Sequence, residues 1–475
     1  MTFNLTYTGT PSFLRVFIDA DQKTTTGYPV GAVGADYLIE NGFLYRYAGA
    51  GGSWAWTLVK SLPLTKSGGV ASWNAAPADL GSPSAINALG NYDAVTASSP
   101  VSYTLVQQAA TAAGRDPLKW PFAATSIWNK PIGSGANYVA SGLHFTTTPN
   151  STEYWYDMPQ SDHERIVLTP TAPVTNVYLS SVGWSGGNRC ASTGSVFFQA
   201  PIPAGYVVPN STYNNGAALL LADGMTVVQT QPFTKCAGYS YATTMQVPWS
   251  ITVWQYNLQT GDGILGAHGG SNLSTLGGTI RLGELRPGTQ MRHALKVNVD
   301  SVASLGLCAG NFSACFTWPA ATADGYAANA GSGYGSATGN TNTAMKMGAL
   351  LAIPAGVDLN SIGLQSVPGK MLAWTLQNYG AYIVDSRGSP GFDFSIEDGA
   401  SGSKADEFQA DYGFPFDGRL GYMTLTDSAG HPTAQAQWVS DIRLIIDNLR
   451  VVSNNSPSSI GGGGTPLQAL APAFQ

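Results

Sequence analysis

Short apolar runs separated by turn residues dominate the first hundred positions of the chain. The runs 35–40 and 43–49 are rich in β-branched and aromatic residues, and Asn41-Gly42 lies between them. An Asn-Gly pair in this position is the strongest short-range signal of a β-hairpin. Several short antiparallel strands at this spacing predict a small β-sandwich over residues 1–108.

The same pattern resumes after a break in composition. Residues 109–119 are small and polar and include a proline, which is typical of a linker. From residue 120 to about 452, apolar runs again alternate with turn signals, and no second break appears. Because all-β domains can exceed about 200 residues, we expect one large antiparallel β-sandwich or jelly-roll-like domain over 120–452, with few short helices.

Some segments of this second part depart from the strand pattern. In 368–384 apolar residues recur at helical spacing before Gly380, which predicts a helix that stops at this glycine. Residues 440–452 fit either a helix or a strand. The Gly- and Pro-rich residues 453–475 predict a tail that is flexible or lies over the surface.

Composition narrows the class of protein. Charged residues make up only 11% of the chain, whereas about 25% is typical of soluble domains. With 44% hydrophobic and 11% aromatic residues the chain can bury a large core, which excludes a disordered chain or a long coiled coil. The net charge is −6 and no Lys/Arg cluster occurs, so we expect neither nucleic acid nor a membrane as a partner. No apolar window is long enough to predict a membrane span.

Four cysteines in a charge-poor chain favour an oxidising compartment. Cys308 and Cys315 flank a short loop and are expected to pair, which leaves Cys190 with Cys236. Four cysteines allow three pairings, and four buried thiols are the alternative. We therefore expect a secreted, extracellular protein. The first residues lack a basic segment followed by an apolar stretch, so we expect a signal peptide to be absent from this sequence because it was removed.

The densest group of titratable side chains lies in the Gly-rich segment 266–300. Residues 279–285 and 291–299 are predicted to form two antiparallel strands joined by a turn. In such a hairpin Glu284 lies near His293, and His268 can converge on both.

A glycosidase fits these residues best. Its reaction needs two carboxylates, about 5–5.5 Å apart for retention or 6.5–9.5 Å apart for inversion. We expect Glu284 and Asp385 to form this pair, with His268 and His293 in the same catalytic group. Arg281 and Trp184 would help to shape the sugar-binding cleft. Other candidates for the partner carboxylate are Asp157, Asp162, Asp393 and Glu397.

Other roles for the same residues stay open. A polysaccharide lyase would use His268, His293, Arg281 or Tyr382 for a β-elimination, although the low Arg and Lys content argues against it. His268, Glu284 and His293 also form a two-histidine, one-carboxylate set that could bind a transition metal. The structural alternative is an ordinary ion pair between Arg281 and Glu284.

Two further groups of residues are candidates for binding. His163 lies in a charged run before a predicted strand, where it could line the site from a loop. Asp19, Asp21 and Asp36 place hard oxygen ligands near Gly-rich turns, which suits a structural calcium ion. Turn-capping aspartates are the alternative. Glycoside hydrolysis by paired carboxylates requires no other cofactor.

The first part of the chain resembles the β-sandwich modules of secreted bacterial enzymes, of the carbohydrate-binding family 9 and DOMON-like type. The residues that carry the resemblance are FIDAD and TG within 17–27, GADYLIENGFLYRY at 34–47, WAW at 54–56 and VASWNAAPADLG at 70–81. The resemblance implies a β-sandwich that binds sugar or assists an enzyme. Trp54 and Trp56 share one face of a strand and are either a sugar platform or part of the core.

Most of residues 120–400 resembles a group of secreted bacterial proteins that has no established activity. The matching stretches include HGGSNLSTLGGTIRLGEL at 268–285 and LAWTLQNYGAYIVD at 372–385. This resemblance transfers no catalytic residue. Together with the residues above, it favours a secreted glycoside hydrolase that acts on a polysaccharide or oligosaccharide. A polysaccharide lyase and a non-catalytic glycan-binding or surface protein are the alternatives.

Overall fold

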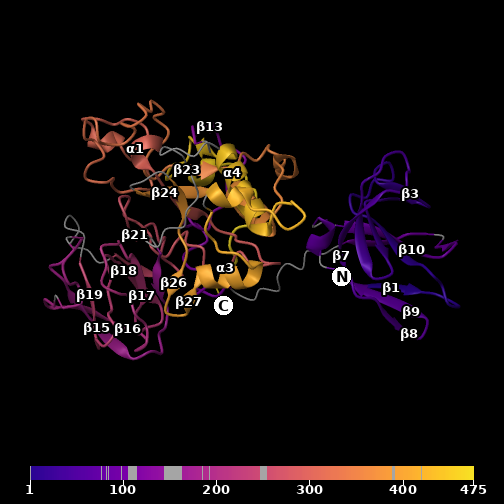
Figure 1. Ribbon diagram of the computed structural model, residues 1–475, viewed down its shortest axis with the longest axis horizontal. Coiled ribbons are helices and arrows are strands. Elements are labelled where there is room, and N and C mark those ends of the chain that lie inside the picture. Colours follow the sequence, from indigo (N-terminus) through magenta and orange to yellow (C-terminus); the bar gives the residue numbers. More distant parts are fainter. Residues whose placement is uncertain are drawn as a thin grey trace. The chain divides into compact units, whose positions relative to one another are not determined.

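The chain forms two compact units, Met1–Ala113 and Gly114–Gln475 (Figure 1). The computed structural model describes all residues except 1, 76, 82, 84, 98, 105–114, 144–162, 185, 192, 246–253, 388–390, 419 and 475. Both units are built mainly of β-strands, which confirms the fold class expected from the sequence.

Two antiparallel sheets form most of the first unit. In spatial order the strands of the smaller sheet are β1 (Thr2–Thr6), β9 (Val70–Asn74) and β8 (Thr65–Ser67). The strands of the larger sheet are β11 (Val95–Thr96), β10 (Ala85–Tyr92), β2 (Leu14–Asp19), β5 (Tyr37–Glu40), β6 (Phe43–Tyr47) and β7 (Trp56–Ser61), with β12 (Val101–Thr104) also paired to β10. Asn41-Gly42 joins β5 to β6, so the hairpin predicted from the sequence is confirmed.

Successive side chains of β2 point to opposite faces of the larger sheet, and both faces are buried at this strand. Ile18 packs with Trp73 of the smaller sheet, whereas Phe17 on the opposite face packs with Val33. Val33 belongs to a short antiparallel hairpin made of β3 (Tyr28–Val30) and β4 (Val33–Ala35). This hairpin therefore covers part of the outer face of the larger sheet.

A mixed six-stranded sheet lies at the centre of the second unit. Its strands, in spatial order, are β13 (Tyr138–Ala140), β28 (Arg450–Val452), β23 (Leu350–Ala352), β24 (Ala381–Ser386), β22 (Leu295–Val299) and β25 (Phe392–Phe394). The pair β22–β24 is parallel, and the other pairs are antiparallel. Along β24, Ile383 faces one core cluster and Tyr382 faces another, as expected of a central strand covered on both sides.

Two smaller sheets pack together beside this sheet. One consists of β14 (Arg165–Val167), β17 (Ala217–Leu220), β18 (Thr226–Thr230) and β20 (Trp254–Asn257), and the other of β16 (Val196–Pro201), β15 (Val174–Leu179) and β19 (Ala242–Thr244). Leu219 of the first sheet shares a core cluster with Val177 of the second. Three further short strands are β21 (Leu265–His268), β26 (Asp398–Gly399) and β27 (Gly402–Ser403).

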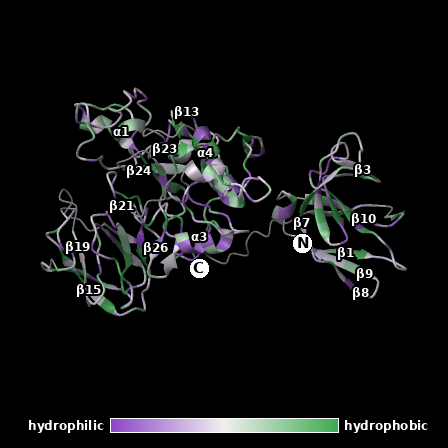
Figure 2. Ribbon diagram, viewed as in Figure 1, coloured by the Kyte–Doolittle hydropathy of each residue, from purple (hydrophilic) through white to green (hydrophobic). Residues whose placement is uncertain are grey.

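The helices of the described residues are few and short, as the sequence predicts. They are α1 (Ser301–Ser304), α2 (Val367–Asn378), α3 (Lys404–Tyr412) and α4 (Ala434–Asn448), with 3-10 turns at η1 (Pro77–Leu80), η2 (Phe312–Ala314), η3 (Leu359–Ile362), η4 (Leu420–Thr424) and η5 (Ile460–Gly462). Hydrophilic residues dominate α3 (Figure 2), which buries Phe408 on one side. None of these helices is long and apolar enough to cross a bilayer.

The helix predicted before Gly380 forms. Ser366 caps α2 by accepting a hydrogen bond from the backbone N–H of Gly369, and the helix stops at Asn378, close to the predicted Gly380. The apolar residues that follow, 381–386, form β24. A central strand is as continuously apolar as a buried helix, so the pattern alone does not separate them. The ambiguous segment 440–452 likewise contains the end of α4 and all of β28.

The C-terminal residues lie closely against the start of the second unit. Gly133 donates its backbone N–H to the carbonyl of Gly461 (2.9 Å), and Gly135 donates to that of Gly463 (2.9 Å). A side chain on Gly133 would overlap the Gly463 carbonyl, which explains why glycine is needed here. The tail is thus laid over the surface.

Both expected disulfides are present, Cys190–Cys236 and Cys308–Cys315. They close loops of different size, with sequence separations of 46 and 7 residues. In the chain-entropy model the larger loop contributes about 4 kcal/mol and the smaller about 2.5 kcal/mol to stability.

We therefore expect Cys190→Ala/Cys236→Ala to lower the free energy of unfolding more than Cys308→Ala/Cys315→Ala. Denaturant unfolding of both double variants, each compared with the parent protein under oxidising conditions, measures the difference. Equal losses, or a larger loss for the 308–315 pair, would contradict the loop-size argument.

Candidate functional site

The predicted strand pair of segment 266–300 does not form. Of the two predicted stretches only Leu295–Val299 is a strand, and residues 281–294 form turns, bends and irregular chain. The carboxylate of Glu284 accepts the backbone N–H of Arg281 (2.7 Å), and Leu285 has a positive φ of 46°. A side chain that binds the nearby backbone offers it an alternative to a strand ladder, and this turn is the result.

Glu284 and His293 form a buried ion pair, as their spacing suggested. The Nε2 of His293 lies 2.9 Å from Glu284 Oε1, and its Nδ1 lies 2.9 Å from the Ala294 carbonyl. Both ring nitrogens thus face acceptors, which suits a protonated ring. Burial alone would lower the pKa of His293, but the charge of Glu284 outweighs it and raises this pKa. Burial alone would raise the pKa of Glu284, but His293 lowers it.

Arg281 extends this pair into a wider ionic network. Its Nε donates to Glu397 Oε2 (2.7 Å), and the Lys404 ammonium contacts the Glu284 carbonyl and donates to Glu407 Oε2 (2.6 Å). These contacts bind the turn after Ile280 to α3. Glu284 thus belongs to a structural network, but the ion pair expected between Arg281 and Glu284 does not form, because Arg281 pairs with Glu397 and Glu284 with His293.

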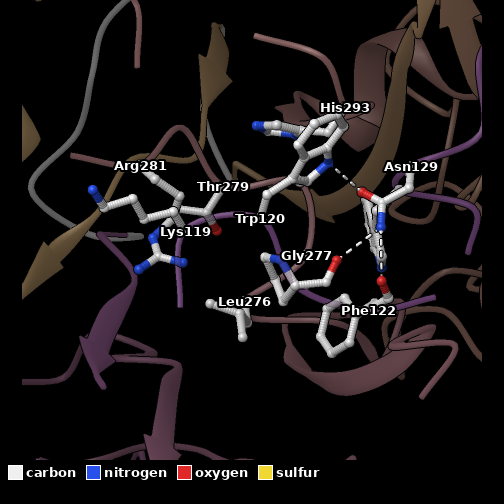
Figure 3. A pocket seen from close by; sticks show the side chains of 12 residues that line it. Lys119, Trp120, Phe122, Asn129, Leu276, Gly277, Thr279, Arg281 and His293 are labelled. Carbon is white, nitrogen blue, oxygen red and sulfur yellow. Dashed lines mark hydrogen bonds between the residues drawn. The ribbon is translucent and has the colours of Figure 1, made fainter. Parts of the chain in front are cut away.

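A small pocket of about 20 Å³ lies next to this network (Figure 3). Arg281 and His293 line it together with Lys119, Trp120 and apolar residues, and the Trp120 indole donates to Asn129 Oδ1 (2.8 Å). The pocket therefore combines cationic side chains with an aromatic wall. Glu284 is not among the lining residues.

His268 lies in a second buried ionic cluster. Its Nδ1 contacts the Glu164 carboxylate, and its Nε2 is 3.2 Å from Asn298 Oδ1. The ammonium of Lys296 also contacts Glu164 and donates to the carbonyls of Ser274 and Thr275, at 2.8 Å each. Burial favours the neutral form of Glu164, but Lys296 and His268 outweigh it and lower its pKa.

The two histidines therefore belong to separate networks. Each ring is bound by its own partners, and His268, Glu284 and His293 do not gather around a common point. Among the described residues, the only group of three or more His, Cys, Asp or Glu side chains close enough to share an ion is Asp19, Asp21 and Asp36. The expected two-histidine, one-carboxylate metal set is thus not formed.

Asp385 lies at the end of β24 and lines an open pocket of about 160 Å³. Trp184, Asn214, Gln231 and Asp324 line the same pocket. The structure thus brings together Asp385 and Trp184, both expected from the sequence. His268 lines a smaller adjoining pocket, which also includes Asn214 and Gln231.

Gly269 and Gly270 bring two carboxylates to this pocket. The backbone N–H of Gly270 donates to Asp385 Oδ1 (2.8 Å), and a Cβ on Gly270 would lie 2.8 Å from the Asp324 carboxylate. With standard bond lengths, oxygens of the two carboxylates are therefore no more than about 8 Å apart. A side chain on Gly269 would overlap Asp385, so only glycine fits at that position.

Asn214 connects the aromatic wall of the pocket to Asp385. Its Oδ1 accepts the Trp184 indole N–H (2.8 Å), and its Nδ2 donates to Asp385 Oδ2 (3.1 Å). Trp184 is nevertheless 37% exposed, so its ring is accessible. Gln231 is 3% exposed, and its Oε1 has no hydrogen-bond partner among the described residues. A buried acceptor of this kind is ready to accept a ligand hydroxyl.

Several expected site residues lie elsewhere in the second unit. Tyr382 is 1% exposed and packs edge-on against Trp128 in the core, so it has no surface for a substrate. His163 pairs with Asp398 (3.5 Å) rather than with the pocket. Of the other candidate acids, Glu397 binds Arg281, and Asp393 binds Arg387 (2.6 Å). Asp157 and Asp162 lie outside the described residues.

Trp54 and Trp56 belong to an aromatic cluster on the first unit. Their ring centroids are 5.6 Å apart, and Tyr28 and Tyr47 complete the cluster, at 5.1 Å from Trp54 and 5.2 Å from Trp56 respectively. Trp54 is 52% exposed and Trp56 is partly buried. The guanidinium of Arg15 lies 5.5 Å from the Trp54 ring. The cluster is therefore both a packing layer and an accessible surface.

Sequence reasoning missed Asp324, Asn214 and Gln231. Asp324-Gly325 looks like an ordinary turn signal, and nothing local distinguishes Asn214 in an Asn-rich stretch. Only the His268-Gly269-Gly270 sequence indicated that another group, such as a ligand, can approach the backbone closely at this point.

The ion pair of Glu284 and His293 makes a testable contribution to stability. Glu284→Gln leaves a buried histidine without its counter-charge, which costs about 3 kcal/mol. The carboxylate's contribution is present above its ordinary pKa of 4.5 and is lost as the pH falls through its lowered pKa. The contribution of His293 is present below its ordinary pKa of 6.5 and is lost as the pH rises through its raised pKa.

The stability difference between the parent and Glu284→Gln should thus be largest between pH 4.5 and 6.5 and should shrink at higher pH. Denaturant unfolding across this range measures it, with Asp406→Asn on the exposed side of α3 as a matched control. A difference that does not change with pH would contradict a charged His293.

Comparison with known proteins gives no relative from which the role of these pockets could be inferred. No family model matches the sequence, and no curated protein and no solved structure is significantly similar to it. The function therefore has to be argued from the pockets and the side chains that line them.

Proposed function

We propose that the protein is a glycoside hydrolase whose catalytic carboxylates are Asp385 and Asp324. The observation that carries this proposal is the approach of the two carboxylates to within about 8 Å beside an open pocket. Glycosidases act with carboxylate pairs separated by about 5–9.5 Å. The proposal keeps Asp385 from the sequence-based pair and replaces Glu284 with Asp324.

The pocket also offers the contacts that a sugar ring needs. An aromatic ring provides a flat apolar face for the C–H side of a sugar, and the exposed ring of Trp184 is available for this role. Asn214 holds that ring next to Asp385, and the unpaired Oε1 of Gln231 can accept a sugar hydroxyl. Ring stacking and hydroxyl recognition would thus meet at the carboxylates.

Both carboxylates accept hydrogen bonds, which stabilise their charged forms. Asp385 accepts them from the backbone N–H groups of Gly270 and Ser386 and from the Asn214 amide. Asp324 accepts one from the phenol of Tyr334 (2.6 Å). We assign Asp385, which accepts more of these bonds, as the base or nucleophile and Asp324 as the acid that protonates the leaving oxygen.

The lyase alternative finds less support. The residues expected to carry out the elimination do not lie in one site. Arg281 and His293 line the pocket of Figure 3, His268 lines a different pocket, and Tyr382 is in the core. The pocket at Asp385 is lined by carboxylates rather than by cations that could neutralise a uronate. A hydrolase is therefore the better match to this pocket.

Asp385→Asn and Asp324→Asn should each lower the release of reducing ends from the active polysaccharide by about 10²- to 10⁴-fold, because each removes one proton-transfer or nucleophilic group. The assay is reducing-end release across a panel of plant, algal and microbial polysaccharides. Asp358→Asn is the matched control, since asparagine keeps the cap at that 3-10 turn.

Absence of reducing-end release by the parent protein on the whole panel would overturn the hydrolase. Ultraviolet absorbance from an unsaturated uronate product would favour the lyase instead. Full activity of either Asp variant would overturn the assigned pair.

The first unit has a separate role in this proposal, as a glycan-binding module of a secreted enzyme. The support is the aromatic cluster, in which Trp54 exposes half of its surface. An exposed indole ring of this kind suits a sugar ring, although the rings of the cluster meet edge to face. The two disulfides agree with an oxidising, extracellular setting.

Trp54→Ala should weaken retention of the full chain on an insoluble polysaccharide by about tenfold, the effect of losing about 1.4 kcal/mol of stacking. Pull-down with the polysaccharide measures this. Phe43→Ala, which removes another exposed aromatic of the same unit, serves as the control. Equal binding by both variants would assign the cluster to packing alone.

A further inference from the structure

Three carboxylates of the first unit meet where β2 ends and β5 begins. Asp19 is the last residue of β2, Asp21 follows in the next turn, and Asp36 directly precedes β5. One oxygen from each carboxylate lies within 4.8 Å of the others. Ligand oxygens of one calcium ion, bound at about 2.3–2.6 Å, are at most about 5 Å apart, so the three oxygens fit a single ion.

One carboxylate oxygen of this group is buried and has no hydrogen-bond partner among the described residues. Asp19 is fully buried (0% exposed), and its Oδ2 has no hydrogen-bond partner among the described residues. Its Oδ1 accepts the backbone N–H of Lys23 (3.1 Å). A buried, unpaired carboxylate oxygen is costly unless a cation compensates it.

The protein supplies little positive charge here. Lys23 approaches Asp21 only to 3.9 Å, and its side chain is 67% exposed. Arg46 attracts Asp36 only through its longer-range charge. Among the described residues, no cationic side chain forms a close ion pair with Asp19 or Asp36.

Other oxygens of the group are already oriented by hydrogen bonds. Asp36 Oδ2 accepts the backbone N–H of Ala20 (2.8 Å), and Asp21 Oδ1 accepts that of Lys23 (2.9 Å). Asp36 Oδ2 also accepts the backbone N–H of Asp21 (3.2 Å), and the Thr26 hydroxyl donates to Asp21 (3.0 Å), so the carboxylates are held in place. The group runs from the buried Asp19 to the exposed Asp21, so water can complete a coordination shell on the outer side.

We propose that Asp19, Asp21 and Asp36 bind one calcium ion, which holds the β3–β4 hairpin against the larger sheet and thereby positions the aromatic cluster. The hairpin lies in the chain between Asp21 and Asp36 and carries Tyr28. The Tyr28 ring is 5.1 Å from Trp54 and 5.6 Å from Trp56. Calcium suits the site better than magnesium, because it accepts irregular shells of six to eight oxygens.

The ion thus acts on the glycan-binding surface without touching a sugar. When it binds, both ends of the 20–36 segment are fixed to the sheet, and Tyr28 is held among the tryptophans. Without the ion, repulsion among the carboxylates favours release of this segment. The ion site itself stands independently of the proposed glycan binding, which concerns only what the positioned rings do.

The test uses the full chain, freed of metal with a chelator and dialysed. Added CaCl2 should raise the Tm of the first unit by about 10 °C once calcium is about 100-fold above its Kd, and MgCl2 should do much less. Tryptophan fluorescence should change over the same calcium range, and because the chain has 12 tryptophans the part due to Trp54 and Trp56 is the change that Trp54→Phe/Trp56→Phe removes. Isothermal titration calorimetry should give one calcium per chain.

Asp19→Asn is the informative variant, because it removes the buried charge but keeps the shape of the side chain. It should lose the calcium-induced shift and, in chelator, should unfold no lower than the parent protein, since repulsion is relieved. Asp79→Asn, an acid paired with Lys60 in the same unit, should keep the calcium response.

Each outcome decides a different part of the proposal. No calcium-dependent shift in the parent protein, or an unchanged shift in Asp19→Asn, would overturn the ion site. An equal response to magnesium would overturn the choice of calcium. Calcium binding without a fluorescence change would overturn the link to the aromatic cluster. Loss of the fluorescence response in Asp19→Asn, with polysaccharide binding absent under all conditions, would support the ion site while contradicting the glycan-binding role.

Discussion

The second unit depends on one buried ionic cluster, formed by Lys296, Glu164 and His268. Lys296 comes from β22, His268 from β21, and Glu164 directly precedes β14, so the cluster joins the central sheet to the smaller ones. Lys296 is fully buried, and its ammonium is bound to Glu164 and to two carbonyls. Removing one partner of such a cluster leaves a buried charge unpaired, at a cost of about 3–5 kcal/mol.

The proposed catalytic pocket follows from this arrangement. His268 ends β21, and the chain then turns through Gly269 and Gly270 between Asp385 and Asp324. The cluster fixes the start of that turn, and the two glycines let both carboxylates approach it. A chain with only 11% charged residues nevertheless buries several of them in hydrogen-bonded networks, as Lys296, Glu164 and Asp385 show.

Much of the fold could be predicted, whereas the site could be predicted only in part. The Asn41-Gly42 hairpin, α2 and the disulfides follow from local patterns and spacing. The strand predicted over residues 279–285 does not form, because Glu284 binds the backbone of its own turn. Asp385 and Trp184 were anticipated as site residues, but Asp324 was not, because its partner lies 61 positions away in the chain and nothing in either sequence neighbourhood records the contact.

The sequence by itself determined the mainly β architecture, the nearness of groups such as Glu284 and His293, and the acidic positions Asp19, Asp21 and Asp36 near the turns between strands. These features depend on the periodicity of apolar residues, on the residues that form turns and on contacts between positions close in the chain. All three can be read from the linear sequence. Only the tertiary structure decided that Tyr382 is core, that Glu284 is structural and that Asp324 faces the pocket beside Asp385. Those outcomes depend on which distant segments pack together, and packing is settled by the shape and burial of the whole unit rather than by any local stretch.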